Sequence, residues 1–459
     1  MAPTDLVAVV PGILGSTLRQ DGRLVWAPSA GAALRAIATF GASIQRLQLP
    51  AGVGDEHPRD GVEPAGLMPD LHVLPGIWTP VKGYDVLLKR LRSLGYRDIS
   101  PDPAAPPGNL LPVGYDWRLS NRYTGQQLAT VIEPALERWR AQGGPYADAR
   151  VTFVCHSMGG LAARWYIERC GGAEVTRKLI TLGTPYRGAA RALHQLVNGA
   201  RHGLGPFGIS LTSFARSLPS LHQLLPEYAC IEHDGDLAKT TETTIPELDT
   251  AMLADAMRFH TDLADAEAHR PDSLQATHPI VGTRQATATT AQIAGGRVTL
   301  IDTYRGENHY GDATVPIVGA CRPDVPLDSN TLRRVPDKHG NLQRNPAALD
   351  ELEGILTAQP IIVRAARPIG LRVDAPEFAL AGEDITVQIT PADNTRHTVR
   401  VAVTSETGRL ADSRVLRPSG GTTATTIDGL APGAYTIEVT GVDPSSPLAP
   451  VSSDILVWA

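Results

Sequence analysis

The stretch VTFVCHSMGGLAARWYIERCGG, residues 151–172, decides the fold of this 459-residue chain. It opens with the apolar run 151–154, whose β-branched and aromatic residues predict a buried strand. A helical pattern follows and ends at Gly171 and Gly172, because glycine is a common stop signal at helix C-termini. Ser157 lies between the two, where a sharp strand-to-helix turn exposes a serine hydroxyl near the positive end of the helix. The stretch therefore predicts a nucleophile elbow.

The residues around Ser157 support this interpretation. A nucleophile elbow needs small residues two places before and after the serine. Gly159 meets that need, whereas Cys155 stands where the common G-x-S-x-G pattern has glycine. The alternative is that Ser157 is a helix N-cap, since its hydroxyl can accept from a backbone N–H. The order of strand, turn and small helix face favours the elbow; the small residues of that face are Gly159, Gly160, Ala162 and Ala163.

Length and composition limit the class of protein. A chain this long should hold two or more domains. The hydrophobic content of 42% and charged content of 20% are ordinary for a globular protein, and the net charge of −6 argues against nucleic-acid binding. Residues 1–12 show no signal peptide, and no run of about 20 apolar residues predicts a transmembrane helix. The scattered cysteines predict reduced thiols in a cytoplasmic protein with no metal and no cofactor; they are Cys155, Cys170, Cys230 and Cys321.

Strands and helices alternate through the first half of the chain. Apolar runs at residues 6–10, 151–154 and 178–182 are typical of strands buried on both faces of a parallel sheet. Amphipathic helices are expected at residues 83–96 and 124–140. This alternation predicts an α/β fold with right-handed crossovers. Later elements of the sheet are expected at residues 110–118, 279–282, 297–304 and 331–335, with a closing helix at 346–356.

Two segments interrupt the alternation. Residues 26–78 have weak periodicity and many prolines and glycines, so we expect them to leave the sheet. Residues 191–277 show no alternation of strand and helix, and we expect a cap or lid at about 190–277. An apolar stripe in this segment is either the core of the cap or a lid face over an acyl-chain pocket. The stripe comprises Leu211, Phe214, Ala215, Leu218, Leu221, Leu224 and Leu225.

A glycine-bracketed loop, residues 11–16, follows the first predicted strand. In an open α/β sheet, ligand sites form at the carboxyl ends of the strands. A loop in that place can turn backbone N–H groups toward a developing oxyanion. We expect the amides of Ile13 and Met158 to form this oxyanion hole, with a plain tight turn as the alternative for the loop.

A serine nucleophile needs a base that takes its proton. After the late strands of the sheet, the histidines that remain are His309, His339 and His397. His309 lies three residues before Asp312, on the same loop, and His397 falls in the C-terminal part of the chain, which has a different pattern. His339 is therefore the expected base.

The base in turn needs an acid that orients it. Asp312 lies on a loop after late strands and is the expected acid, with Asp302 and Asp337 as lesser alternatives. The alternative interpretation of Asp312 is an ordinary aspartate in a turn, without a catalytic role. The chain order of Ser157, Asp312 and His339 is the order of an α/β-hydrolase.

From about residue 371 the pattern changes to short alternating strands without helical runs. Regularly spaced strands of this kind predict a small β-sandwich of immunoglobulin-like type. We therefore expect an α/β-hydrolase catalytic domain at residues 1–365, with its cap at 190–277, and a β-sandwich at 371–459. The strands expected in the sandwich include residues 385–389, 398–403, 434–439 and 455–458.

Taken together, these motifs resemble the lecithin:cholesterol acyltransferase family of α/β-hydrolases, which includes lysosomal phospholipase A2 and phospholipid:diacylglycerol acyltransferases. The resemblance spans about residues 6–356 and leaves out the β-sandwich. Its motifs are each modest but specific together: VPGILGSTL (10–18), YDWRLS (115–120), CHSMGG (155–160), LGTPYRG (182–188), GDATVP (311–316) and HGNL (339–342).

The resemblance implies roles for individual residues. Trp117 and Leu14 would lie beside the substrate pocket. Ala313 stands where the family has glycine in GDGTVP, a change that should be tolerated. Carried over, the resemblance makes Ser157 the nucleophile, Asp312 the orienting acid and His339 the base, with Ile13 and Met158 at the oxyanion hole.

The resemblance also implies an activity. We expect a serine esterase, lipase or O-acyltransferase that acts on a lipid-like ester through an acyl-enzyme, which water or an alcohol acceptor resolves. Transient contact with a membrane surface is an expected partner interaction, and nucleic acid is not. The alternative is a catalytically silent binding or scaffold protein of the same fold. In either case the β-sandwich could serve as a docking module for a partner, a membrane or a carbohydrate.

Overall fold

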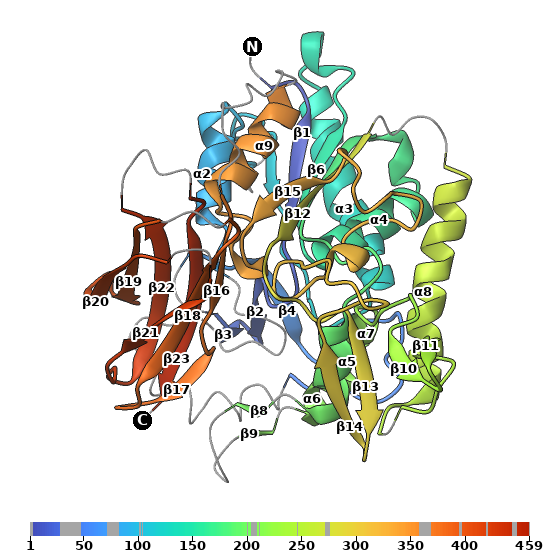
Figure 1. Cartoon of the computed structure of the whole chain (residues 1–459). Coiled ribbons are helices and arrows are strands. Elements are labelled where there is room, and N and C mark those ends of the chain that lie inside the picture. Colours follow the sequence, from blue (N-terminus) through green and yellow to red (C-terminus); the bar gives the residue numbers. More distant parts are fainter. Residues whose placement is uncertain are drawn as a thin grey trace.

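An α/β part and an all-β part of the chain lie side by side in the computed structural model (Figure 1). The structure describes the following residues: 3–27, 47–70, 82–100, 102, 104–199, 201–202, 209–210, 212–245, 247–270, 276–357, 369–393, 397–418, 421–442 and 448–458.

A six-stranded, all-parallel sheet forms the centre of the α/β part, in the order β15-β12-β7-β6-β1-β5. Its central strands are completely buried because apolar side chains cover both faces. Val10 pairs with Cys155, and His156 pairs with Leu182, so three strands end at the same edge. The strands are β1 (Leu6–Val10), β5 (Leu110–Pro112), β6 (Val151–His156), β7 (Thr176–Leu182), β12 (Ala276–Thr283) and β15 (Arg333–Pro336).

Helices cover both faces of this sheet, as expected for an α/β fold (Figure 1). Helices α2 (Asp85–Ser93) and α9 (Pro346–Thr357) lie on one face. Arg90 of α2 donates a hydrogen bond to the Glu353 carboxylate of α9 at 2.7 Å. Helices α3 (Asn121–Arg140) and α4 (Gly159–Arg169) lie on the other face. Helix α3 begins three residues before the predicted start, because the Ser120 hydroxyl caps it by accepting from the Arg122 N–H at 3.0 Å.

The interpretation of residues 297–304 as part of the central sheet is wrong. They form β14 (Arg297–Ile301), which pairs antiparallel with β13 (Thr290–Ala294) in a separate sheet of order β11-β10-β13-β14. The reason is the two-residue turn Gly295–Gly296, where both residues have positive φ. A glycine pair at such a turn closes a hairpin, so the chain returns beside β13 and does not cross back to the parallel sheet.

The segment expected as a cap contains strands as well as helices. Strands β10 (Ile231–His233) and β11 (Asp236–Ala238) belong to the four-stranded sheet, so the expectation of no alternation is wrong there. The apolar stripe is buried in the main core, apart from Leu211, which lies outside the described residues. This burial favours the core interpretation over a lid face. The helices of the segment are α5 (Ala190–Asn198), α6 (Thr212–Ser217), α7 (Pro219–His222) and α8 (Thr250–Ala268), and β8 (Arg201–His202) pairs with β9 (Ile209–Ser210).

The segment 26–78 is described only in part. Within it, β4 (Val62–Leu67) pairs antiparallel with β2 (Ser16–Gln20), and β3 (Arg23–Trp26) completes a three-stranded sheet. This small sheet extends directly from the loop at residues 11–16, so it anchors that loop. Residues 28–46 and 71–81 lie outside the description.

The all-β part consists of two sheets, β16-β18-β21 and β17-β23-β22-β19-β20. Alternate residues of β18 and β19 are buried, and the buried ones form a hydrophobic core of their own. That separate core supports the proposed division after residue 365, although residues 358–368 are outside the description. The strands are β16 (Leu371–Asp374), β17 (Phe378–Leu380), β18 (Ile385–Pro391), β19 (Val399–Ser405), β20 (Leu410–Leu416), β21 (Thr423–Ile427), β22 (Gly433–Gly441) and β23 (Val451–Trp458).

Candidate active site

The three residues expected as a catalytic triad meet at the carboxyl edge of the central sheet. His339 Nε2 lies 2.7 Å from Ser157 Oγ, and His339 Nδ1 lies 2.7 Å from Asp312 Oδ2. A carboxylate only accepts, so Nδ1 carries the proton and Nε2 is free to accept the serine proton. All three residues are at most 1% exposed. The arrangement has the geometry of an activated serine nucleophile.

Ser157 lies on the predicted strand-to-helix turn in a left-handed backbone conformation, with φ of +53°. Such a conformation costs a non-glycine residue about 1–3 kcal/mol and is common at functional sites. The Ser157 N–H donates to Leu182 O at 2.9 Å, and the Thr184 hydroxyl donates to Ser157 O at 2.8 Å. Met158, not Ser157, is the N-cap of α4, which favours the elbow over the cap. Cys155 is accommodated inside β6, where burial raises the pKa of its thiol well above the usual value.

The Asp312 loop orients the carboxylate rigidly. Asp312 Oδ1 accepts from the N–H groups of Thr314 at 3.0 Å and Val315 at 2.6 Å, which leaves Oδ2 for His339. Ala313 has a φ of +71°, a conformation that glycine adopts freely, and this explains the glycine of the family pattern. Gly282 of β12 allows the close approach, since a Cβ there would lie 2.4 Å from the Asp312 Cβ.

The loop expected to supply an oxyanion donor packs directly on Ser157. A Cβ added to Gly12 would lie 2.8 Å from the Ser157 Cβ, so only glycine fits there. Ile13 and Met158 are both buried beside the nucleophile. Within the described part of the chain, neither backbone N–H has a hydrogen-bond acceptor. Both groups are therefore available to a ligand oxygen.

The two residues expected at the substrate pocket support the loop at residues 11–16. The Trp117 indole is completely buried and donates to Ser16 O at 3.2 Å. Its ring lies edge-on to Trp26, at a centroid distance of 5.3 Å. Leu14 is 4% exposed, has a φ of +64°, and accepts the Trp26 indole N–H at 3.1 Å through its carbonyl. Their contact with a substrate stays a proposal.

Three of the four alternative acids and bases contact partners other than Ser157 and His339. Asp337 accepts from Asn341 at 3.1 Å and from Asn345 at 2.8 Å, and burial raises the pKa of its carboxyl. His309 lies 3.7 Å from Glu307. His397 lies 2.6 Å from Asp393 in the all-β part. Asp302 is half-buried after β14.

A second hydrogen-bonded chain runs beside the triad. The Tyr84 hydroxyl accepts from Gly12 N–H at 2.9 Å and lies 2.9 Å from His156 Nδ1, while His156 Nε2 lies 3.1 Å from His339 O. A carbonyl oxygen only accepts, so Nε2 carries the proton and Tyr84 donates to Nδ1. Burial and the neighbouring His339 lower the pKa of His156 to about 3, so the ring stays neutral. These contacts connect the loop at residues 11–16 to the turn that carries His339.

Sequence reasoning did not find this chain. Tyr84 is the residue before helix α2, and His156 directly precedes Ser157; neither is among the residues expected at the site. The available signal was the polar His156 at the end of an otherwise apolar strand. A buried histidine there needs partners for both ring nitrogens.

Replacing Tyr84 with phenylalanine should reduce kcat about 10-fold and lower the free energy of unfolding. The change leaves the buried Gly12 N–H and His156 Nδ1 without partners, and each orphaned group costs about 1–3 kcal/mol. Tyr166→Phe is the matched control, since Tyr166 is also completely buried but its hydroxyl has no hydrogen-bond partner in the described residues. Steady-state kinetics on a short-chain ester and urea unfolding measure both effects. Identical behaviour of the two variants would contradict this role of Tyr84.

The described residues contain no group of three or more His, Cys, Asp or Glu side chains that could hold a metal ion. None of the helices within them is long and apolar enough to cross a membrane. All four cysteines are free.

Comparisons with known proteins agree with the motifs. Residues 79–285, which include Ser157 but not Asp312 or His339, match the family model "Lecithin:cholesterol acyltransferase". The human lysosomal phospholipase A and acyltransferase is 29% identical over 116 residues, which are 24% of this chain and 27% of that protein. An uncharacterized protein of Saccharomyces cerevisiae is 26% identical over 181 residues, 39% of this chain and 23% of its own length. The chain thus spans about a quarter of the length of these curated relatives.

A comparison of solved structures returns a Bacillus licheniformis lipase in its propeptide form. The match has 12% sequence identity and covers 99% of this chain and 93% of the lipase. Its TM-score is 0.35, which is too low to establish a shared fold. The fold assignment depends on the parallel sheet, its strand order and the helices on both faces.

Proposed function

Since the family match confirms the resemblance of this chain to the lecithin:cholesterol acyltransferase family, we propose that the protein is a serine-dependent esterase, lipase or O-acyltransferase. The observation that carries the proposal is the continuous hydrogen-bonded line from Asp312 through His339 to Ser157, with 2.7 Å at each step. The human relative is a phospholipase A and acyltransferase, which supports a lipid-like ester as the substrate class.

In this mechanism Ser157 attacks the ester carbonyl. His339 Nε2 takes the hydroxyl proton as the Ser157 Oγ–carbon bond forms, and Asp312 stabilises the resulting imidazolium. The amides of Ile13 and Met158 donate to the oxyanion of the tetrahedral intermediate. His339 then gives its proton to the departing alkoxide, which leaves an acyl group on Ser157.

The second half of the reaction decides between hydrolase and transferase. Water or an alcohol loses a proton to His339 and attacks the acyl carbon. The bond from that carbon to Ser157 Oγ then breaks, His339 returns the proton to Oγ, and a fatty acid or a new ester leaves. The two outcomes share the same protein groups and differ in which nucleophile reaches the acyl carbon. We propose lipid esters as substrates and an alcohol as the acceptor, with transient contact at a membrane surface and no nucleic-acid partner.

The test is a product analysis on phosphatidylcholine vesicles with and without a long-chain alcohol. We expect free fatty acid in both mixtures and an acyl ester of the alcohol in the second, because the acyl-enzyme accepts either nucleophile. Mass spectrometry of the extracted lipids measures both products. Fatty acid without acyl ester would remove the transferase half of the proposal. If neither forms, and esters of varied chain length also stay intact, the silent scaffold becomes the better description.

The domain roles and location belong to the same proposal. Residues 1–365 would be the catalytic domain, with a cap at about 190–277, and residues 371–459 a β-sandwich. The separate hydrophobic cores of the two parts support this division. A cytoplasmic location is supported by the four free cysteines, because reduced thiols are usual in that compartment.

A further inference from the structure

The β-sandwich contacts the turn that carries His339. Lys338, the residue before the proposed base, donates from Nζ to the Ser453 hydroxyl of β23 at 2.8 Å. Asn341, on the same turn, donates to Ser452 O at 2.9 Å. Ser453 is only 4% exposed, so water does not substitute freely for this contact. Two neighbouring residues of one sandwich strand therefore hold both sides of His339.

A third contact reaches the same turn through Lys82. The Lys82 ammonium pairs with Asp454 of β23 at 3.3 Å, and both side chains are largely buried, with exposures of 12% and 6%. The Lys82 backbone N–H donates to Gly340 O at 3.4 Å, directly after His339. The turn is thus connected to β23 through three separate residues.

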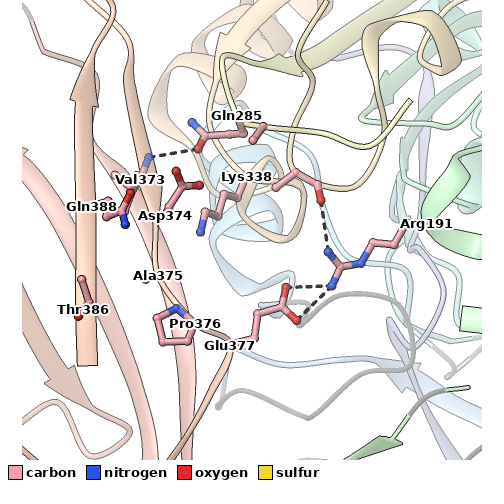
Figure 2. Close-up of a pocket in the computed structure, with 12 residues that line it drawn as sticks. Arg191, Gln285, Lys338, Val373, Asp374, Ala375, Pro376, Glu377, Thr386 and Gln388 are labelled. Atoms are coloured by element: carbon pink, nitrogen blue, oxygen red, sulfur yellow. Dashed lines mark hydrogen bonds and ion pairs between the residues drawn. The ribbon is translucent and has the colours of Figure 1, made fainter. Parts of the chain in front are cut away.

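The loop that carries Asp312 is held by a different sandwich strand. The backbone of Gln285 exchanges two hydrogen bonds with Gly311, at 3.1 and 3.2 Å. The side chain of Gln285 donates to Leu371 O at 3.0 Å and accepts from Val373 N at 3.5 Å, so it binds the backbone of β16 in both directions. Figure 2 shows Gln285 reaching β16 across the boundary between the two parts.

An ion pair adds a second connection on this side. Arg191 binds both carboxylate oxygens of Glu377, at 2.9 and 3.1 Å, and donates to Ala313 O at 3.5 Å (Figure 2). Beside these contacts lies a polar cavity of about 520 Å³, which Lys338 and Asp374 also line. The boundary is held by polar groups around a cavity, so its geometry depends on individual hydrogen bonds more than on apolar packing.

From these contacts we propose that the β-sandwich is a positioning element of the active site, which holds the His339 turn through Ser453 and the Asp312 loop through Gln285. The inference rests on the proposed serine chemistry and goes beyond it, because the sandwich lies outside the family resemblance. A small displacement of a catalytic group lowers the rate steeply. The contact of Ser453 with Lys338, the residue before the base, should therefore affect turnover. This role differs from that of a docking module, which would leave turnover of a soluble ester untouched.

The test uses single substitutions in the full chain. Ser453→Ala removes the partner of Lys338, and Gln285→Met removes both contacts to β16 at similar volume. We expect each substitution to lower kcat on a short-chain ester about 5- to 50-fold, and to lower the rate of fluorophosphonate labelling by the same factor. KM should change less than about 2-fold, because the substitutions move the triad and not the substrate pocket. Ser413→Ala is the matched control, since Ser413 lies exposed on β20 at the far edge of its sheet.

Hydrogen exchange supplies a readout that does not need activity. Faster exchange in peptides covering residues 337–342 is expected for Ser453→Ala, and in peptides covering residues 311–316 for Gln285→Met. Slowed labelling together with these loop-confined changes supports the proposal. Labelling rates and exchange equal to those of Ser413→Ala overturn it while the serine chemistry stands. If the wild-type protein itself takes no label, the serine chemistry fails, and exchange alone still decides whether the sandwich holds the two loops.

Discussion

Replacing Ser157 with alanine should reduce ester turnover about 10³- to 10⁶-fold, since the attacking oxygen is lost while the fold stays intact. The variant should also lose the single adduct that a fluorophosphonate forms with the wild-type protein. Alanine fits the site because Ser157 is held by its backbone, through the bond from its N–H to Leu182 O at 2.9 Å and the bond from Thr184 to its carbonyl at 2.8 Å. Intact-mass spectrometry and an ester assay measure the two effects.

Ser220→Ala is the matched control for this substitution. Ser220 is also completely buried, and its hydroxyl donates to Arg118 O at 3.1 Å, away from His339. This control should keep the adduct and near-normal turnover. Full activity in a folded Ser157→Ala protein would remove the nucleophile assignment. An adduct that persists in that variant would identify a different reactive residue.

The second large effect is expected for Asp312→Asn, with kcat about 10³- to 10⁴-fold lower. The carbonyl oxygen of the new side chain should take the Oδ1 position, because the N–H groups of Thr314 and Val315 donate there at 3.0 and 2.6 Å. Its NH₂ group then faces His339 Nδ1 and donates to it. That nitrogen must accept, so the ring proton moves to Nε2, and His339 can no longer take the proton of Ser157.

The kinetics of this variant distinguish a tautomer effect from loss of structure. KM and the unfolding midpoint should stay close to the wild-type values, because the side chain keeps its shape and its backbone partners. Asp302→Asn, a change at one of the two alternative acids, should leave kcat unaltered. If Asp302→Asn abolishes turnover and Asp312→Asn does not, the assignment of the acid is wrong.

Prediction from sequence succeeded where a signal is confined to a few neighbouring residues. The run 151–154, the turn at Ser157 and the small helix face that follows are adjacent in the chain, so strand, elbow and helix could be predicted together. Buried strands such as β1 were predicted because each consists of apolar residues on both faces. The same local reasoning fails at residues 297–304, because their apolar pattern does not show that the Gly295–Gly296 turn pairs them with β13 in a separate sheet.

Individual residues of the candidate site show the same division. Asp312 and His339 could be named by elimination and chain order, but the 2.7 Å contact of His339 with Ser157 joins residues 182 positions apart. Tyr84 and His156 are 72 positions apart, and nothing near Tyr84 indicates its partner. The contacts of Ser452 and Ser453 in β23 could not be predicted from the sequence, because their partners Lys338 and Asn341 lie in the other part of the chain.

The amino-acid sequence by itself determined the α/β class, the elbow, the C-terminal β-sandwich and the identities of the expected triad. Hydrophobic periodicity and turn chemistry act over a few residues, so neighbouring residues are enough to predict those features. Only the tertiary structure decided the convergence of Ser157, Asp312 and His339, the Tyr84–His156 chain, and the contacts of the sandwich with the loops that carry Asp312 and His339. Each depends on polar atoms that come within about 3 Å only after the sheet closes, because hydrogen bonds require that distance and a defined direction.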